Sequence, residues 1–164
     1  MAREGEADRT VVRAQGDDRY EIVATERFDC SPTELWELLC DWERLVAVGL
    51  PGMPRDFRWL SGGPREAPST FEFTVAGTVL KVEIYELTAD EETNRYRLRY
   101  RALEPALGVL EYDAVLDVEP IAGRATALRA VRTVRLEPGS APNMLAGMVD
   151  GEMQSLKDHF AGNK

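Results

Sequence analysis

Hydrophobic and polar residues alternate with a period of two along much of the chain, and this pattern predicts β-strands. The clearest case is residues 95–102, where arginines alternate with tyrosine, leucine and alanine. In residues 110–119 the polar positions are acidic, so these two strands can pair opposite charges in water while their apolar side chains face inward. With the other runs we expect about six or seven strands, the remaining ones including 20–28, 71–75, 78–87 and 125–136.

A helical period replaces this alternation in two places. The first begins at Ser31, which can act as an N-cap, while Pro32 suits the first turn and Glu34 completes a capping box. Leucine, tryptophan and valine follow at helical spacing until a stretch rich in glycine and proline, which predicts one or two short helices. The second place is a long helix that we expect to run from a cap at Ser140 to about Ala161.

The order of these elements predicts an α+β fold. One strand is followed by two short helices, a meander of strands with tight turns, and one long C-terminal helix. Strands joined by tight turns pair antiparallel, and a sheet with one polar face must cover its other face with the helices. The length of 164 residues suits one domain, so we expect a flexible segment over 1–18 and a single domain over 19–162.

Composition excludes several classes of partner. The formal net charge of −9 opposes binding to a phosphate backbone, so we expect no nucleic acid. The sequence contains no apolar run of the roughly 20 residues that a bilayer-spanning helix needs, and we expect no stable membrane insertion. The N-terminal segment is charged and lacks the apolar centre of a signal peptide, which indicates a cytoplasmic protein.

Metal and cofactor chemistry finds little support in the sequence. Cys30 and Cys40 are too few for a disulfide framework, and we interpret them as small apolar side chains beside the first helix. His159 is the sole histidine, and no Cys/His spacing is typical of a zinc site. The glycines lack the pattern of a phosphate-binding loop, so we expect neither a metal nor a cofactor.

The order of elements and several short motifs resemble the START-like superfamily, also called Bet v 1-like or SRPBCC proteins, which have the helix-grip fold. Within it, the chain is similar to the bacterial polyketide cyclase/dehydrase and lipid-transport group. The motifs that carry the resemblance are Ser31-Pro32-Thr33-Glu34-Leu35-Trp36, Cys40-Asp41-Trp42-Glu43, Leu50-Pro51-Gly52, Tyr100-Arg101 and Tyr112 after a loop containing Pro105. The resemblance implies a curved antiparallel sheet that grips the long helix, with a cavity between them.

Residues of the predicted inner surface are our candidates for binding. On the long helix, apolar residues cluster on one side, and Glu152 falls near the middle of that side. A carboxylate buried there needs a cation, a polar cavity or a raised pKa. Arg132 has an inward position in the last strand and is the candidate partner. The candidate ligand-binding residues are Phe71, Phe73, Tyr96, Tyr100, Tyr112, Arg132, Leu145, Met148, Val149, Glu152 and Leu156.

Each candidate has an alternative interpretation. A bulge could turn Arg132 outward, a rotation of the helix could expose Glu152 to water, and the tyrosines could be ordinary core residues.

The sequence leaves three candidate functions open. The first is binding or transport of a small hydrophobic molecule such as a lipid, isoprenoid or polyketide-like compound. The second is a polyketide cyclase or dehydratase that uses Arg132 and Glu152 for acid–base chemistry, and the third is an interaction protein with a filled cavity. An exposed edge strand would also allow a homodimer.

Overall fold

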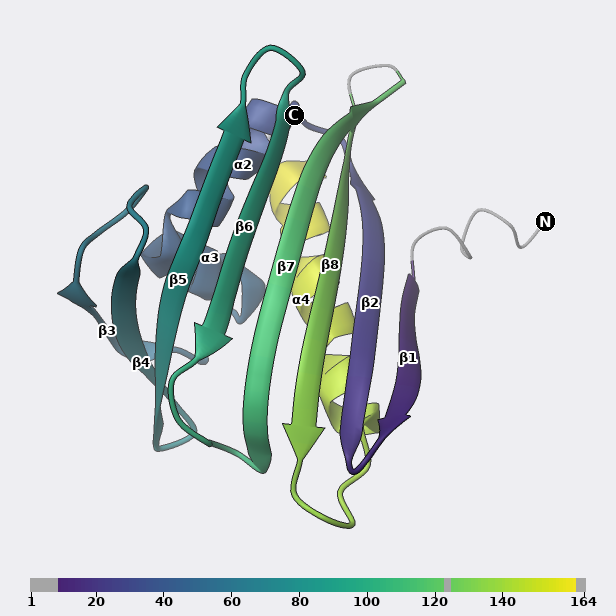
Figure 1. Cartoon of the computed structure of the whole chain (residues 1–164). Helices are drawn as coiled ribbons and strands as arrows, with labels where there is room; N and C mark the ends of the chain where they lie inside the picture. The colour runs from purple at the N-terminus through teal and green to yellow at the C-terminus, as the bar shows by residue number, and fades with distance from the viewer. Residues whose placement is uncertain (1–8, 123–124, 162–164) are drawn as a thin grey trace.

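The computed structural model describes residues 9–122 and 125–161. Eight strands form a single curved antiparallel sheet in the order β1-β2-β8-β7-β6-β5-β4-β3, and all three described helices lie on one face of it (Figure 1). The predicted α+β helix-grip fold is confirmed. In chain order the elements are β1 (Arg9–Gly16), β2 (Arg19–Phe28), α2 (Pro32–Cys40), α3 (Trp42–Gly49), β3 (Arg55–Ser61), β4 (Ser69–Val75), β5 (Thr78–Asp90), β6 (Arg95–Ala102), β7 (Val109–Ile121), β8 (Ala125–Leu136) and α4 (Asn143–Ala161).

The N-terminal part of the sheet differs from the prediction. Residues 1–18 were expected to be flexible, but β1 pairs with β2 from Arg9 onward, and the two helices therefore follow the second strand. Asp17 and Asp18 connect the strands with φ angles of 53° and 60°, the left-handed backbone that tight two-residue hairpins require. An Asp-Asp pair is a weaker turn signal than Asn-Gly, which is why the hairpin was missed. Residues 1–8 lie outside the described part of the chain.

The start of α2 has the predicted capping box. The Ser31 hydroxyl accepts a hydrogen bond from the backbone N–H of Glu34 at 3.1 Å, and the Glu34 carboxylate accepts one from the Ser31 N–H at 3.0 Å. Asp41 ends α2 and caps α3, because its carboxylate accepts from the N–H of Arg44 at 3.4 Å. These caps fix the point where the chain leaves β2 and place both short helices under the sheet.

The long helix α4 begins later than predicted. It starts at Asn143 instead of directly after Ser140. Pro142 explains the difference, because a proline disfavours helical backbone in the residue that precedes it. From there α4 crosses the concave face of the sheet below β7, β8 and β2, with its C-terminal end near α2 (Figure 1). Thr10 of β1 donates a hydrogen bond to the carboxylate of Asp150, so the first strand also holds this helix.

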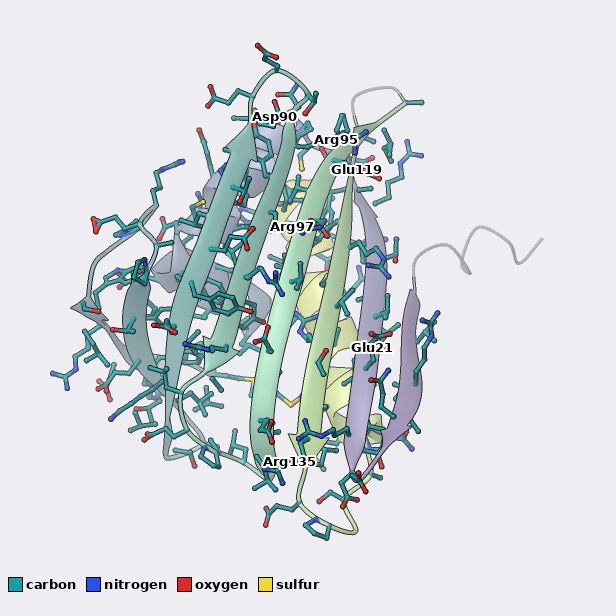
Figure 2. The ribbon with its side chains drawn as sticks, in the orientation of Figure 1. Glu21, Asp90, Arg95, Arg97, Glu119 and Arg135 are labelled. Atoms are coloured by element: carbon teal, nitrogen blue, oxygen red, sulfur yellow. The ribbon has the colours of Figure 1, made fainter. Side chains whose placement is uncertain are left out.

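The outer face of the sheet carries the predicted cross-strand charge pairs. Arg97 binds both carboxylate oxygens of Asp117, at 2.7 and 3.2 Å. Arg95 pairs with Glu119, two residues away on each of the same strands. Figure 2 shows Arg95, Arg97 and Glu119 on the face that points away from the helices. Exposed pairs of this kind contribute little stability each, about 0–1 kcal/mol. Because the charged side chains occupy the outer face of the sheet, the apolar side chains of the same strands point to the opposite face and form the core.

The core lies between the concave face of the sheet and the three helices. Both cysteines are buried and free, as small core side chains. Among the described residues no helix is long and apolar enough to cross a bilayer. The fully buried side chains that join the sheet to the helices include Ile22, Phe28, Leu35, Leu39, Leu98, Leu128 and Met153.

Two glycines on the exposed side of α4 provide a test of this helix. A Cβ atom at Gly147 or Gly151 would meet no atom within 4 Å. We therefore expect Gly147→Ala and Gly151→Ala each to raise the free energy of unfolding by about 0.5–1 kcal/mol, because alanine loses less backbone entropy in a helix. Urea denaturation measures the change.

Gly62→Ala is the matched control for these substitutions. Gly62 has a φ of 68°, and its Cβ would lie 2.6 Å from the Cβ of Ser69, so this variant should be less stable than the parent chain. If the two α4 variants also lose stability, Gly147 and Gly151 do not face open space on the exposed side of α4.

Candidate functional site

A cavity of about 600 Å³ lies between the concave face of the sheet and helices α3 and α4. Strands β4 to β8 form one wall, and the inner faces of the two helices, with Leu39 of α2, form the other. Most of the lining side chains are aliphatic or aromatic. Leu107, in the loop between β6 and β7, and Met144, in the first turn of α4, line the cavity and are 53% and 80% exposed. The cavity wall therefore continues to the protein surface between this loop and the start of α4.

Most of the residues predicted to bind a ligand line this cavity, but three do not. The ones that line it are Phe73, Tyr100, Tyr112, Arg132, Leu145, Met148, Glu152 and Leu156. Phe71 is fully buried between the rings of Trp42 and Phe57, and Tyr96 stacks on Trp36 at a centroid distance of 5.0 Å. Val149 is 1% exposed and belongs to the core. An inward position in a strand or helix is therefore not enough, because α2 and α3 cover part of the inner face.

Sequence reasoning missed the contribution of α3 and of two loops. Trp42, Leu45 and Val46 line the cavity from α3, although their spacing indicated only a buried helix face. The lining residues at the open end come from the β6–β7 loop and the segment before α4, neither of which has a periodic pattern. No signal in the sequence distinguishes a side chain that faces a cavity from one that packs in a core.

Arg132 reaches the inside because β8 continues its alternation without a bulge. It pairs with Ile22 of β2 and Ala114 of β7, two fully buried neighbours, and its side chain is 3% exposed. The alternative in which a bulge turns Arg132 outward is therefore wrong. Tyr112 follows the same rule on β7, two residues before Ala114 on the same face of the strand.

Four polar side chains meet on the cavity wall, and we call them the Arg132 cluster: Arg132, Glu152, Tyr112 and Tyr100. The Arg132 Nε donates a hydrogen bond to the Tyr112 hydroxyl at 2.6 Å, and the hydroxyls of Tyr112 and Tyr100 lie 3.1 Å apart. Arg132 Nη2 is 3.6 Å from Glu152 Oε2, an ion pair that is longer than a hydrogen bond. Three strands and α4 thus bring one cation, one carboxylate and two hydroxyls together.

Two buried donors in the cavity lining have no hydrogen-bond partner among the described residues. They are Nη1 of Arg132 and Nε1 of Trp42. A buried donor that makes no hydrogen bond costs about 1–3 kcal/mol, and more when the group is charged. Both N–H groups are therefore available to donate a hydrogen bond to a molecule in the cavity.

Burial shifts the ionisation of the cluster. It raises the pKa of Glu152 above the usual carboxyl value, although the charge of Arg132 opposes this rise in part. It also raises the pKa of Tyr112 well above 10, so this hydroxyl stays neutral. Burial alone would lower the pKa of Arg132, but Tyr112, Tyr100 and Glu152 outweigh it and the guanidinium stays charged. The cluster therefore contains a permanent cation beside a carboxyl group that can change its protonation state.

The described residues contain no group of three or more histidine, cysteine or acidic side chains that could hold a metal ion. His159 lies outside the cavity lining, with its Nε2 3.4 Å from Nη2 of Arg44. It therefore has no contact with the Arg132 cluster.

Comparison with known families agrees with this geometry. Residues 19–161 match the family model described as "Polyketide cyclase / dehydrase and lipid transport". The chain belongs to this family. The match runs from the first residue of β2 to the last residue of α4, so it includes every element that lines the cavity. This places the chain in the START-like, or Bet v 1-like, superfamily.

Solved structures of this superfamily have the same fold. One is norcoclaurine synthase from Thalictrum flavum in complex with dopamine and hydroxybenzaldehyde, with a TM-score of 0.59 and 15% sequence identity over 91% of this chain and 96% of that one. A point mutant of the same enzyme in complex with a transition-state analogue gives a TM-score of 0.57 and 16% identity over 92% and 97%. At such low identity the likeness concerns the fold alone. No curated protein sequence matches the chain.

The raised pKa of Glu152 predicts a pH-dependent contribution to stability. Folded Glu152 holds its proton more tightly than the unfolded chain does, so the free energy of unfolding should fall as the pH rises from about 4.5 through the folded pKa. Glu152→Gln removes this titration. We expect the stability of Glu152→Gln relative to the parent chain to increase across that pH window and then level off, as measured by urea denaturation at a series of pH values. A constant difference at every pH would contradict the assignment.

Proposed function

We propose that the protein binds a small, mainly apolar molecule in the cavity between the sheet and α4. The observation that carries the proposal is the cavity itself, about 600 Å³ in volume and lined mostly by aliphatic and aromatic side chains. Pockets for small molecules commonly measure about 300–1,000 Å³ and combine an apolar lining with a few polar groups. The family, whose description includes lipid transport, supports the same proposal.

Access from the surface also supports binding. Met148 lines the cavity and is 36% exposed, and Leu107 and Met144 are exposed on the same rim. Methionine is flexible and adapts to different apolar shapes, which suits an entrance. The volume of the cavity also favours binding over the alternative of an interior filled by the protein's own side chains. The expected lipid, isoprenoid or polyketide-like ligand would enter past this rim.

A pair of tryptophan substitutions on β5 tests the proposal. Val82 lines the cavity and is 9% exposed, whereas Val79 on the same strand is 44% exposed and lies outside the lining. We expect Val82→Trp to weaken binding of the neutral fluorescent probe N-phenyl-1-naphthylamine by about 10-fold or more, because the indole fills the cavity. Val79→Trp should bind the probe like the parent chain. Fluorescence titration measures both, and equal weakening in the two variants, or no binding by the parent chain, would refute the proposal.

A second candidate function is a polyketide cyclase or dehydratase, and the Arg132 cluster is the observation that favours it. The Glu152 carboxylate could remove a proton from a CH₂ group between two ketones, and the Arg132 guanidinium could stabilise the enolate oxygen that forms. Turnover of a poly-β-ketone mimic, followed by product analysis, tests this candidate. Glu152→Gln should abolish turnover and retain binding of the neutral probe. Absence of turnover in the parent chain would leave binding as the function.

A further inference from the structure

The polar groups of the cavity wall are mostly hydrogen-bond donors. Arg132 has five N–H groups, and among the described residues only Nε makes a hydrogen bond to a neighbour. The Trp42 indole N–H has no partner among the described residues. One hydroxyl proton is used between Tyr100 and Tyr112, and the other hydroxyl proton of the pair can be donated to a ligand. Within the Arg132 cluster the acceptor is the Glu152 carboxylate, and it lies beyond hydrogen-bond distance of Arg132. A ligand that complements this wall must bring acceptor oxygens.

The charges narrow the choice of acceptor. The buried guanidinium is a permanent cation whose nearest counter-ion is 3.6 Å away. Arginine binds a carboxylate through two parallel charge-assisted hydrogen bonds, which are about twice as strong as bonds to a neutral oxygen. A ligand carboxylate bound there would replace Glu152 as counter-ion. If Glu152 takes up one proton from solvent at the same time, the net charge of the site is unchanged.

We propose that the ligand is an apolar molecule with one carboxylate, that Arg132 binds this carboxylate, and that Glu152 becomes protonated when the ligand binds. The proposal rests on the proposed function, because it assigns the head group of a ligand held in the same cavity. It extends that function from hydrophobic binding in general to the class of long-chain or polycyclic carboxylic acids.

The surroundings of Glu152 are consistent with this role. Arg132 on β8 and Tyr112 on β7 face it from the sheet, and Tyr100 on β6 contacts Tyr112. On α3 the neighbour is Gly49, where a Cβ atom would lie 3.9 Å from Glu152 Cγ, and glycine brings no titratable group. Arg132 is therefore the charge that opposes protonation of Glu152. A ligand carboxylate that neutralises Arg132 removes this opposition.

Lys81 is the rival cation for a ligand carboxylate. It also lines the cavity, but its side chain is 40% exposed and its ammonium lies 3.9 Å from the carboxylate of Glu104. Water screens a charge in this position, so an ion pair formed there contributes little to affinity. Arg132, at 3% exposure, is desolvated and should discriminate an acid from a neutral molecule more strongly.

The experiment compares two ligands that differ only in the head group. Decanoic acid and 1-decanol displace the neutral probe N-phenyl-1-naphthylamine from the full chain at pH 7, and the displacement constants are compared. We expect the acid to bind about 10-fold or more tightly than the alcohol, because a charge-assisted pair forms with Arg132. Arg132→Met should remove this preference, whereas Arg129→Met, an exposed arginine on the same strand, should leave it unchanged. Loss of the preference in Lys81→Met and not in Arg132→Met would overturn the assignment.

The pH dependence provides a second and independent test. Between pH 6 and 8.5 decanoic acid is ionised in water, so uptake of a proton by Glu152 should weaken binding of the acid as the pH rises. Binding of 1-decanol should not change. In Glu152→Gln the acid should bind at least as tightly as to the parent chain, with no dependence on pH. This variant retains Arg132, so it decides the proposal even if Arg132→Met does not fold.

Each failure has its own meaning. Equal affinity for the acid and the alcohol, in a parent chain that binds the probe, would overturn the carboxylate proposal and leave the cavity as a general hydrophobic site. An acid preference that is independent of pH in the parent chain would overturn the role of Glu152. Failure of the parent chain to bind the probe at all would instead refute the proposed function.

Discussion

Arg132 carries a positive charge on the inner face of the sheet, next to side chains that are fully buried. Moving an ion out of water is expensive, and a partner must compensate for the lost hydration. Tyr112 accepts a hydrogen bond from its Nε, and Glu152 approaches from α4. The positions of these residues on β7 and α4 follow from that requirement.

The fold tolerates a charged group and a cavity in its interior because other, densely packed parts of the molecule supply its stability. Interiors normally pack as densely as organic crystals, and a cavity of about 600 Å³ gives up many contacts. The capping box of α2, the contacts of Phe71 with Phe57 and Trp59, and the β1–β2 strand pair lie outside the cavity lining. Thr10 of β1 fixes α4 from the opposite edge. The packed regions therefore surround the cavity and hold its walls apart.

The sequence predicted the fold well where local rules decide it. The capping box at Ser31 and the alternation of arginine with apolar residues in β6 both have a local cause, and both are confirmed. The hairpin at Asp17 was missed because its turn residues are unusual, and the start of α4 was misplaced because Pro142 outweighs Ser140. The missed hairpin accounts for β1, and β3 is the other strand that lies outside the six predicted ranges.

The candidate site was predictable only in part. Alternation places Arg132, Tyr112 and Tyr96 on the same face of the sheet, but it does not say which part of that face a helix covers. Trp36 stacks on Tyr96 and removes it from the cavity, while Tyr112 remains beside Arg132. Which inward residues face open space depends on the path of α2 and α3 across the sheet. That path depends on contacts between distant segments, and the periodicity of a single segment does not predict it.

The separation of the Arg132 cluster from the apolar walls has a consequence for how such a protein can diversify. The cluster is held by β6, β7, β8 and α4, whereas Phe73, Val82 and Val46 shape the cavity from β4, β5 and α3. Substitutions in the second group alter the length and breadth of the space without disturbing the polar contacts. One scaffold could therefore serve a series of homologous compounds that share an end group and differ in their carbon skeleton.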